Sequence, residues 1–404
     1  MTASAQSPID SPAAWRRMFI SLAIGSVGCA GFWSYVVALP AVQADFAVTR
    51  AQASLPYTLI MLGFAFGGIA MGWATDRFGV FSALAGGAVL MALAYGLAGV
   101  STGIVSFALT QGLLGLGCSA CFSPLMADIS HWFERRRGLA VTIVSSGNYV
   151  AGTIWPPLIQ YVIDAQGWRM AHFGLGLICL AAVAPMAFLL RAPPPAGAAA
   201  KTPPKPLQGV VALPSGVLLI MICVAGFACC MAMSMPQVHL VAYCADLGYG
   251  PAQGAQMLSI MLALGVVSRI ISGFVCDRIG GLMTLLIGSG AQGVALLLYM
   301  FFDGLTSLYV ISGIFGFFQG GIIPMYAVIV REYFPAGKAG AHIGLIIMAT
   351  LLGMAMGGWF SGVIFDWTGS YRAAFFNGAL WNLVNLAVVA LIIWRRRPAA
   401  PAFA

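Results

Sequence analysis

Charge is scarce in this sequence. Only 7% of its 404 residues are Asp, Glu, Lys or Arg, whereas 61% are hydrophobic. Ordinary soluble domains carry about 25% charged residues. Because a water-soluble fold must present a large polar surface, a chain of this composition cannot hide its apolar surface from water. The composition therefore excludes an ordinary soluble protein and predicts that lipid surrounds most of the chain.

The motifs of enzymes and of ATP-driven pumps are also missing. The sequence contains no Walker-type phosphate loop, no Ser/His/Asp arrangement and no metal-ligand cluster. We therefore expect no enzymatic activity, no cofactor and no metal site. The formal charge of +8 is spread over single residues or threes between apolar runs, which argues against nucleic-acid binding. The nine cysteines lie almost all inside apolar runs, and we interpret them as small helix-packing residues.

Long apolar runs are abundant instead. A helix needs about 20 apolar residues to cross a bilayer. Cutting the chain at charges, prolines and polar turns predicts an all-α membrane protein of twelve transmembrane helices in two pseudo-symmetric six-helix halves. The predicted spans are 18–41, 54–75, 80–100, 103–128, 138–162, 170–191, 213–238, 253–276, 281–301, 304–330, 341–364 and 373–394. The Pro-rich segment 192–212 is predicted to be a cytoplasmic linker between an N-terminal half, 1–191, and a C-terminal half, 213–404.

The two predicted halves share a loop sequence. Gly-x-x-x-Asp-Arg-x-Gly occurs at 72–79 and again at 273–280, 201 residues later. An Asp at a helix end can pair with an Arg and with the dipole of a neighbouring helix, which makes a breakable latch; ordinary topogenic charge is the alternative. Two matching copies favour the latch, which we assign to Asp76, Arg77, Asp277 and Arg278. A membrane protein built from two similar halves points to a transporter whose site lies between them.

Basic residues are distributed unevenly between the two sides of the predicted spans. All but four of the 19 Lys and Arg residues fall on the side of the N-terminus. The opposite side carries only Arg50, Arg169 and Arg372, and Arg269 lies within a span. Positive charge is retained on the cytoplasmic side, so we expect an inner or plasma membrane protein with both termini and the linker in the cytoplasm.

These features resemble the major facilitator superfamily over essentially the whole length. The resemblance implies two halves that rock around a central cavity, with the repeated loop stabilising the outward-open state. The stretch Trp132–Ala140, before the fifth span, is also typical of that family. Its Arg135, Arg136 and Arg137 join the predicted latch by resemblance, although a positive anchor on the cytoplasmic side explains much of this triplet.

Arg269 is the sharpest candidate for a functional residue. It lies eight residues before Asp277, which places it roughly 12 Å from the helix end and near the middle of the bilayer. An arginine there costs at least about 2.5–3.5 kcal/mol, so it should face a cavity. A guanidinium matches a carboxylate as a bidentate fork, which predicts a carboxylate substrate. The alternative is a structural ion pair, but no Asp or Glu occurs in the middle of any predicted span.

An arginine at this place in the eighth span resembles the monocarboxylate transporters and their oxalate/formate relatives. Phe32–Tyr35 and Gly369–Phe375 also resemble that branch. The chain departs from it by having Gly265 in place of an aspartate and no lysine in the first span, so the family's proton relay cannot be transferred. It also lacks a second cation in the eleventh span, which favours a monoanion. We therefore expect a secondary active transporter of a small organic monoanion, such as lactate or pyruvate, with proton coupling left open.

The remaining candidates are polar side chains within apolar spans. We expect Tyr35, Asn148, Gln319 and Tyr326 to line the cavity, with ordinary helix packing as the alternative. His239 could carry or sense a proton, or be a histidine at the membrane interface. Two other functions stay open. One is a carrier or exporter of a larger neutral, aromatic or drug-like compound, a vitamin for example. The other is a transport-inactive receptor of the same fold, which the lack of a long signalling segment disfavours.

Overall fold

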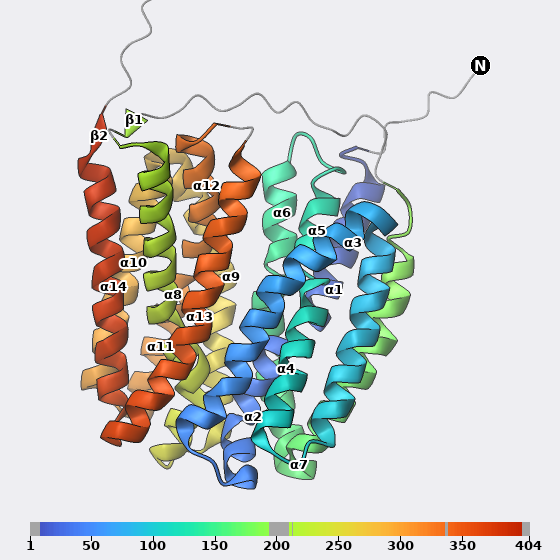
Figure 1. The fold of residues 1–404 in the computed structure, drawn as a ribbon, viewed down its shortest axis with the longest axis vertical. Coiled ribbons are helices and arrows are strands. Elements are labelled where there is room, and N and C mark those ends of the chain that lie inside the picture. The colour runs from blue at the N-terminus through green and yellow to red at the C-terminus, as the bar shows by residue number, and fades with distance from the viewer. Residues whose placement is uncertain (1–8, 194–209, 212, 336–337, 398–404) are drawn as a thin grey trace, which may run out of the picture. The chain divides into compact units, whose positions relative to one another are not determined.

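The computed structural model describes residues 9–193, 210–211, 213–335 and 338–397, and Figure 1 shows their arrangement as helices. The predicted linker 192–212 lies mostly outside these residues. Its assignment and the boundaries of the two halves therefore stay predictions. Two short strands, β1 (Val210–Val211) and β2 (Arg396–Arg397), pair antiparallel.

The described residues form ten helical stretches that are long and apolar enough to cross a membrane. Two of them, Arg50–Gly99 and Arg137–Phe188, are longer than a bilayer needs, and each changes direction at a glycine with positive φ. These glycines are Gly79, with φ 80°, and Gly167, with φ 84°. Only glycine adopts such angles without strain, so each stretch is a pair of spans joined by a tight turn. When each pair is counted as two spans, the number of spans in the described residues rises from ten to twelve. The predicted all-α fold is confirmed.

Several spans consist of two helices rather than one. The helices are α1 (Pro12–Gly28), α2 (Ala30–Phe46), α3 (Arg50–Gly99), α4 (Ile104–Ser119), α5 (Ser123–Ile129), α6 (Arg137–Ser145), α7 (Gly147–Phe188), α8 (Ser215–Asp246), α9 (Pro251–Ile279), α10 (Gly281–Phe301), α11 (Leu305–Gln319), α12 (Ile322–Tyr333), α13 (Ala339–Thr368) and α14 (Tyr371–Trp394). The predicted spans 18–41, 103–128, 138–162 and 304–330 are each interrupted, near residues 29, 121, 146 and 320. Such breaks release backbone carbonyls that a continuous helix would occupy, and other groups can then bind them.

The helices gather into two compact units. The first contains Met1–Ala41 and Leu62–Thr202, and the second contains Val42–Met61 and Pro203–Ala404. In the first unit, α1 packs on α5, α6 and α7. In the second, α8 packs on α13, α14 and α9, while α10 contacts α11 and α14 (Figure 1). The end of α2 and the start of α3 thus belong with the helices of the second half of the chain.

The repeated loop has the same backbone in both halves. Gly79 has φ 80° and ψ 162°, and Gly280 has φ 82° and ψ 166°. The second copy is fixed by Glu332 of α12, whose carboxylate accepts a hydrogen bond from the backbone N of Gly281, at 3.1 Å from Oε1. The sequence repeat is therefore also a repeat of local structure.

A buried ion pair fastens the first unit. Arg17 of α1 donates from Nε and Nη2 to the two carboxylate oxygens of Asp128, at 2.7 and 2.8 Å. Its Nη2 also donates to the carbonyl of Leu190, and the guanidinium carbon lies 4.4 Å from the ring centroid of Trp132. Both charged side chains are nearly excluded from solvent, so removing either partner would leave a buried charge uncompensated.

Helix α13 presents pairs of small residues to two different neighbours. Gly353 and Gly357 lie against Phe227 and Ser234 of α8. Gly358 and Gly362 instead lie against the start of α3: a Cβ atom at Gly362 would be 2.8 Å from the carbonyl oxygen of Arg50. Glycines four residues apart on one helix face let two backbones approach closely in a membrane. This packing brings Arg50 to the second unit.

Candidate functional site

Arg269 lies in the second unit, at the break between α11 and α12. Its side chain is only 7% exposed. The Nε atom donates a hydrogen bond to the carbonyl oxygen of Gly320, at 3.2 Å. That carbonyl lies just after the last residue of α11, and the adjoining Gly321 N donates to the Oγ of Ser268 at 3.2 Å. The helix break therefore supplies a backbone acceptor that orients a guanidinium in the interior of the span.

Gln319 lies at the same break. It is the last residue of α11 and is fully buried. Its Oε1 accepts a hydrogen bond of 2.7 Å from Nε2 of Gln237 on α8, while its own Nε2 has no hydrogen-bond partner among the described residues. A buried donor without a partner costs free energy and is therefore suited to receive a ligand oxygen. Gln237 was not predicted from the sequence, because one glutamine in an apolar run gives no signal of its own.

The other predicted cavity residues lie in two different units. In the second unit, the Tyr326 hydroxyl points to Oδ1 of Asn385 at 3.5 Å and is buried. In the first unit, Asn148 accepts from Nε1 of Trp33, at 3.0 Å through its backbone oxygen and 3.2 Å through its side chain. Tyr35 is buried beside Phe107, with ring centroids 5.6 Å apart. A role for these residues in substrate binding stays a prediction.

The predicted latch residues make local contacts within their own units. The guanidinium carbon of Arg77 lies 5.5 Å from the ring centroid of Trp73 and 5.4 Å from that of Phe78. Arg278 occupies the last turn of α9, where a cation is favoured by the helix dipole. In the arginine triplet, Arg135 N donates to the Asp10 carboxylate, Arg136 lies over the Trp15 ring, and Arg137 donates to the Ser130 hydroxyl. The latch function of these residues, and of Asp76 and Asp277, stays a prediction.

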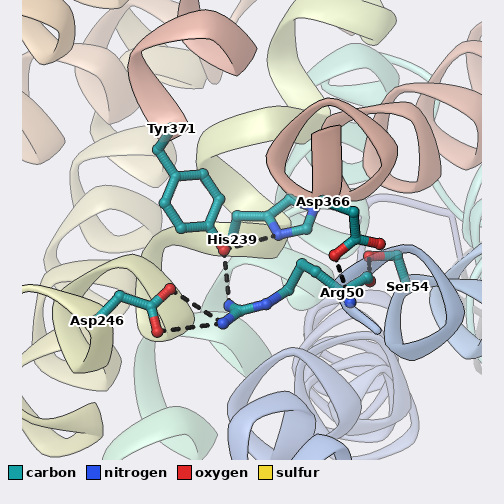
Figure 2. Close-up of polar contacts among 6 residues, drawn as sticks. All are labelled: Arg50, Ser54, His239, Asp246, Asp366 and Tyr371. Atoms are coloured by element: carbon teal, nitrogen blue, oxygen red, sulfur yellow. Dashed lines mark hydrogen bonds and ion pairs between the residues drawn. The ribbon is translucent and has the colours of Figure 1, made fainter. Parts of the chain in front are cut away.

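A second polar cluster surrounds Arg50, at the start of α3. We call it the Arg50 network, and it consists of Arg50, Ser54, His239, Asp246, Asp366 and Tyr371 (Figure 2). Arg50 Nη2 donates to both carboxylate oxygens of Asp246, at 3.1 and 2.9 Å, and its Nη1 donates to the Tyr371 hydroxyl at 2.7 Å. The guanidinium carbon also lies 4.9 Å from the ring centroid of Phe365. One arginine thus connects the ends of α8, α13 and α14.

The backbone of Arg50 joins the same network. Asp366, near the end of α13, accepts hydrogen bonds from the backbone N of Arg50 at 2.9 Å and of Ala51 at 2.8 Å. A carboxylate in this position satisfies free N–H groups and the positive end of the helix dipole. The Ser54 hydroxyl closes the first turn by donating to the Arg50 carbonyl at 2.8 Å. Asp366 therefore caps α3 although it belongs to a helix more than 300 residues away in sequence.

His239 belongs to the Arg50 network. The side chain is fully buried. One ring nitrogen, Nε2, lies 2.8 Å from the carbonyl oxygen of Gly358. The other, Nδ1, lies 3.3 Å from the Tyr371 hydroxyl (Figure 2). A role for His239 in carrying or sensing a proton stays a prediction.

The Arg50 network was missed by sequence reasoning, which treated Arg50 as a loop charge. A signal was present. Arg50 is one of only three basic residues on its predicted side, and Asp246 and Asp366 fall at helix ends on that same side. Acidic and basic residues that lie together on the side of a membrane protein with few basic residues are candidates for ion pairs.

Twelve apolar spans, a repeated Asp-Arg loop and an interior arginine at a helix break define a membrane transporter of two related halves. The sequence profile of the Major Facilitator Superfamily matches residues 21–315 and 277–404, and the chain belongs to this superfamily.

Its relatives and structural neighbours are transporters. The chain is 30% identical over 322 residues to monocarboxylate transporter 13 of Bos taurus, covering 78% of this chain and 74% of that protein. It is 25% identical to the agnestins efflux protein AgnL12 of Paecilomyces divaricatus, over 79% of this chain and 72% of the relative. Among solved structures, a bacterial homologue of the human lysosomal transporter Spinster has a TM-score of 0.72 at 15% identity, covering 97% of this chain and 100% of that one. A mutant of the nucleoside transporter NupG has a TM-score of 0.73 at 14% identity, covering 93% and 99%.

Proposed function

We propose that this transporter carries a small organic monoanion, a monocarboxylate such as lactate or pyruvate, and that Arg269 binds its carboxylate. The buried guanidinium at the break between α11 and α12 is the observation that carries this proposal. A buried guanidinium is a favourable partner for an anion, because its N–H groups donate charge-assisted hydrogen bonds to a carboxylate. The similarity to monocarboxylate transporter 13 supports the same substrate class.

The groups at the helix break suggest how the anion is held. Arg269 offers N–H groups in a planar fork, which matches two carboxylate oxygens. The unpaired Nε2 of Gln319 offers a further donor, and Gln237 keeps that carboxamide oriented through its hydrogen bond to Oε1. Binding of a monoanion neutralises the site, which lowers the cost of moving it through alternating access. A dianion would retain an uncompensated charge.

The proposal also includes the orientation and the rocking machinery. We place the protein in an inner or plasma membrane with both termini in the cytoplasm, because of the distribution of its basic residues. The two Asp-Arg-x-Gly loops and the arginine triplet would then act at the cytoplasmic side as latches between conformations. The identical turns at Gly79 and Gly280 support a shared function for the two loops. Coupling of transport to a proton is part of the same hypothesis.

A carrier or exporter of a larger neutral or aromatic compound is the second candidate. It is favoured by the aromatic side chains that donate to backbone in the first unit, such as Trp33 to Asn148 and Trp155 to Ser26. The similarity to AgnL12, an efflux protein by name, points in the same direction. In that case Arg269 would be a hydrogen-bond donor without a charged ligand.

Uptake into proteoliposomes distinguishes the two candidates. Radiolabelled lactate and pyruvate are compared with lactamide and pyruvamide, which keep the shape and lose the charge, and with dicarboxylates and vitamins. For Arg269→Gln we expect carboxylate uptake at limiting substrate to fall at least about 10-fold, since a hydrogen bond to a charged group contributes about 1.5–3 kcal/mol. Arg269→Lys should recover only part of it, because lysine keeps the charge and loses the fork.

Arg372→Gln is the matched control. This arginine also belongs to the second unit, but its side chain is 64% exposed and pairs with Asp303 at 3.4 Å. We expect it to leave uptake within about threefold of the wild type, as exposed pairs contribute little. Carboxylate uptake that survives Arg269→Gln unchanged would refute the anion site. Uptake of the amides or of a vitamin in preference to carboxylates would establish the second candidate.

A further inference from the structure

When His239 is neutral, the hydrogen bonds through its ring have only one possible direction. Arg50 can only donate, and the Gly358 carbonyl can only accept. The Tyr371 oxygen therefore accepts from Arg50 Nη1, and its own proton points to His239 Nδ1. Since Nε2 lies 2.8 Å from the Gly358 carbonyl, Nε2 carries the single imidazole proton. The chain from Arg50 through Tyr371 and His239 to Gly358 is complete only when the imidazole is neutral.

We propose that His239 is the proton-binding site of this transporter, and that the Arg50 network is a gate which neutral His239 holds closed and protonated His239 opens. The ligand is a proton, and its acceptor is Nδ1. This inference concerns a different place from the Arg269 site and does not depend on the identity of the substrate.

Protonation removes the acceptor on which the network depends. With a proton on Nδ1, the imidazole and Arg50 would both donate to the Tyr371 oxygen, and the Tyr371 proton would have no acceptor in the chain. The added charge would also be buried beside Arg50, whose Nε already has no hydrogen-bond partner among the described residues. Of the carboxylates nearby, Asp366 favours the added charge but already accepts from two backbone N–H groups, and Asp246 is paired with Arg50. Protonation therefore weakens the closed arrangement.

The segment that the network holds is the one that must move. Val42–Met61 lies in the first half of the sequence but packs with the second half. Beside the Arg50 network, the contact includes Gly358 against the Tyr57 ring, Gly362 against the start of α3, and a hydrogen bond of 2.9 Å from the Thr58 hydroxyl to the Ala355 carbonyl. If the halves rock, this contact has to open at the end of the second unit that carries Asp246 and Tyr371. A proton that arrives from that side would release it.

The test measures the opening directly and without substrate. Nitroxide labels are attached to Ala44→Cys and Gly304→Cys, two exposed positions of the second unit, and their separation is recorded by double electron–electron resonance in lipid nanodiscs. Of the nine native cysteines only Cys223 is not buried, so Cys223→Ser and a water-soluble label suffice. The ratio of open to closed molecules should rise about tenfold for each pH unit of acidification, over the interval in which only the open form binds the proton.

Two histidine variants separate the proposal from a general effect of acid. His239→Gln keeps a neutral side chain that can donate to Gly358 and accept from Tyr371, and it should remain closed without responding to pH. His172→Gln is the control, because His172 is equally buried, belongs to the first unit and bonds the Trp168 carbonyl at 2.8 Å. It should keep the wild-type response. A wild type that shows no response, a response that survives in His239→Gln, or the same loss in His172→Gln would each overturn the proposal.

Tyr371→Phe provides a second test if His239→Gln fails to insert into the membrane. It removes the hydroxyl that links Arg50 to His239 and leaves the ring that contacts Phe365, 4.4 Å away between centroids. The closed fraction should fall at every pH, and the response to acid should weaken, because only the electrostatic effect of Arg50 on a protonated His239 remains. A closed fraction that still depends on pH as in the wild type would overturn the proposal. Because no substrate is added, these outcomes are independent of whether Arg269 binds a carboxylate.

Discussion

The contact between α13 and α3 can be weakened at Gly362 without changing any charge. A Cβ atom there would lie 2.7 Å from the Ser54 Oγ, 2.8 Å from the Arg50 carbonyl oxygen and 3.1 Å from the Ala51 Cα. Ordinary contacts are near 3.5 Å, and two of these three atoms are backbone that cannot rotate away. In Gly362→Ala the start of α3 must therefore shift by about half an ångström, or the helices must separate.

The size of the effect follows from the cost of overpacking, which is about 1–3 kcal/mol. The higher helix propensity of alanine stabilises α13 in both the open and the closed state, so it cancels. At about 1.4 kcal/mol per factor of ten, the ratio of closed to open molecules should fall roughly 5- to 150-fold. The distance between labels at positions 44 and 304, measured as for His239, reports this ratio.

Gly344→Ala is the matched control on the same helix. A Cβ atom at Gly344 would meet nothing within 4 Å, so this variant should remain within about twofold of the wild type. A Gly362→Ala protein that stays as closed as Gly344→Ala would refute the reasoning, since it would mean that the close approach of α13 and α3 does not limit the closed state.

Two further predictions concern stability, measured as the thermal unfolding midpoint in detergent. Asp128→Asn leaves the buried Arg17 without its carboxylate and should lower the free energy of unfolding by about 3 kcal/mol. The double variant Arg17→Met with Asp128→Leu should recover most of this loss. An unchanged midpoint in Asp128→Asn would show that the pair is not needed. Gly79→Ala forces alanine to φ 80° and should lower the midpoint by the equivalent of about 1 kcal/mol or more, whereas Gly72→Ala, where a Cβ meets nothing within 4 Å, should not lower it.

The features that sequence could predict are those with a strong local signal. Each span is visible because about 20 apolar residues in succession are needed to cross lipid. Arg269 is visible because a charge in the middle of such a run is costly, and the structure finds it buried at a helix break. The loops at Asp76 and Asp277 are visible because the second repeats the first, and the equal angles at their terminal glycines agree with this.

The Arg50 network could not be predicted in the same way. Arg50 lies at a polar helix end, where an arginine is ordinary. Its partners Asp246, Asp366 and Tyr371 are 196, 316 and 321 residues away, so no periodic pattern connects them. The repeat does not help either, because the position 201 residues after Arg50 is Pro251, which has no charge. Only the tertiary packing of α3 on α13 brings these groups together.

Breaks within spans were missed for a related reason. A hydropathy pattern measures the apolar character of a run and is insensitive to whether its backbone stays helical. At residues 320–321 two glycines separate α11 from α12, and the carbonyl released there binds Arg269. A pair of glycines within an apolar span should therefore be considered together with the nearest charged residue inside a span, because a carbonyl released at the glycines can bind that residue.

The capping of α3 by Asp366 has a consequence for the heat of opening. Arg50 N and Ala51 N find their acceptor on another helix, so the first turn of α3 is completed only while α3 and α13 are in contact. When they part, these N–H groups pass to water and the turn becomes free to unwind. Opening should then absorb heat and gain chain entropy, as a small melting transition does, and its equilibrium should move towards the open form on warming.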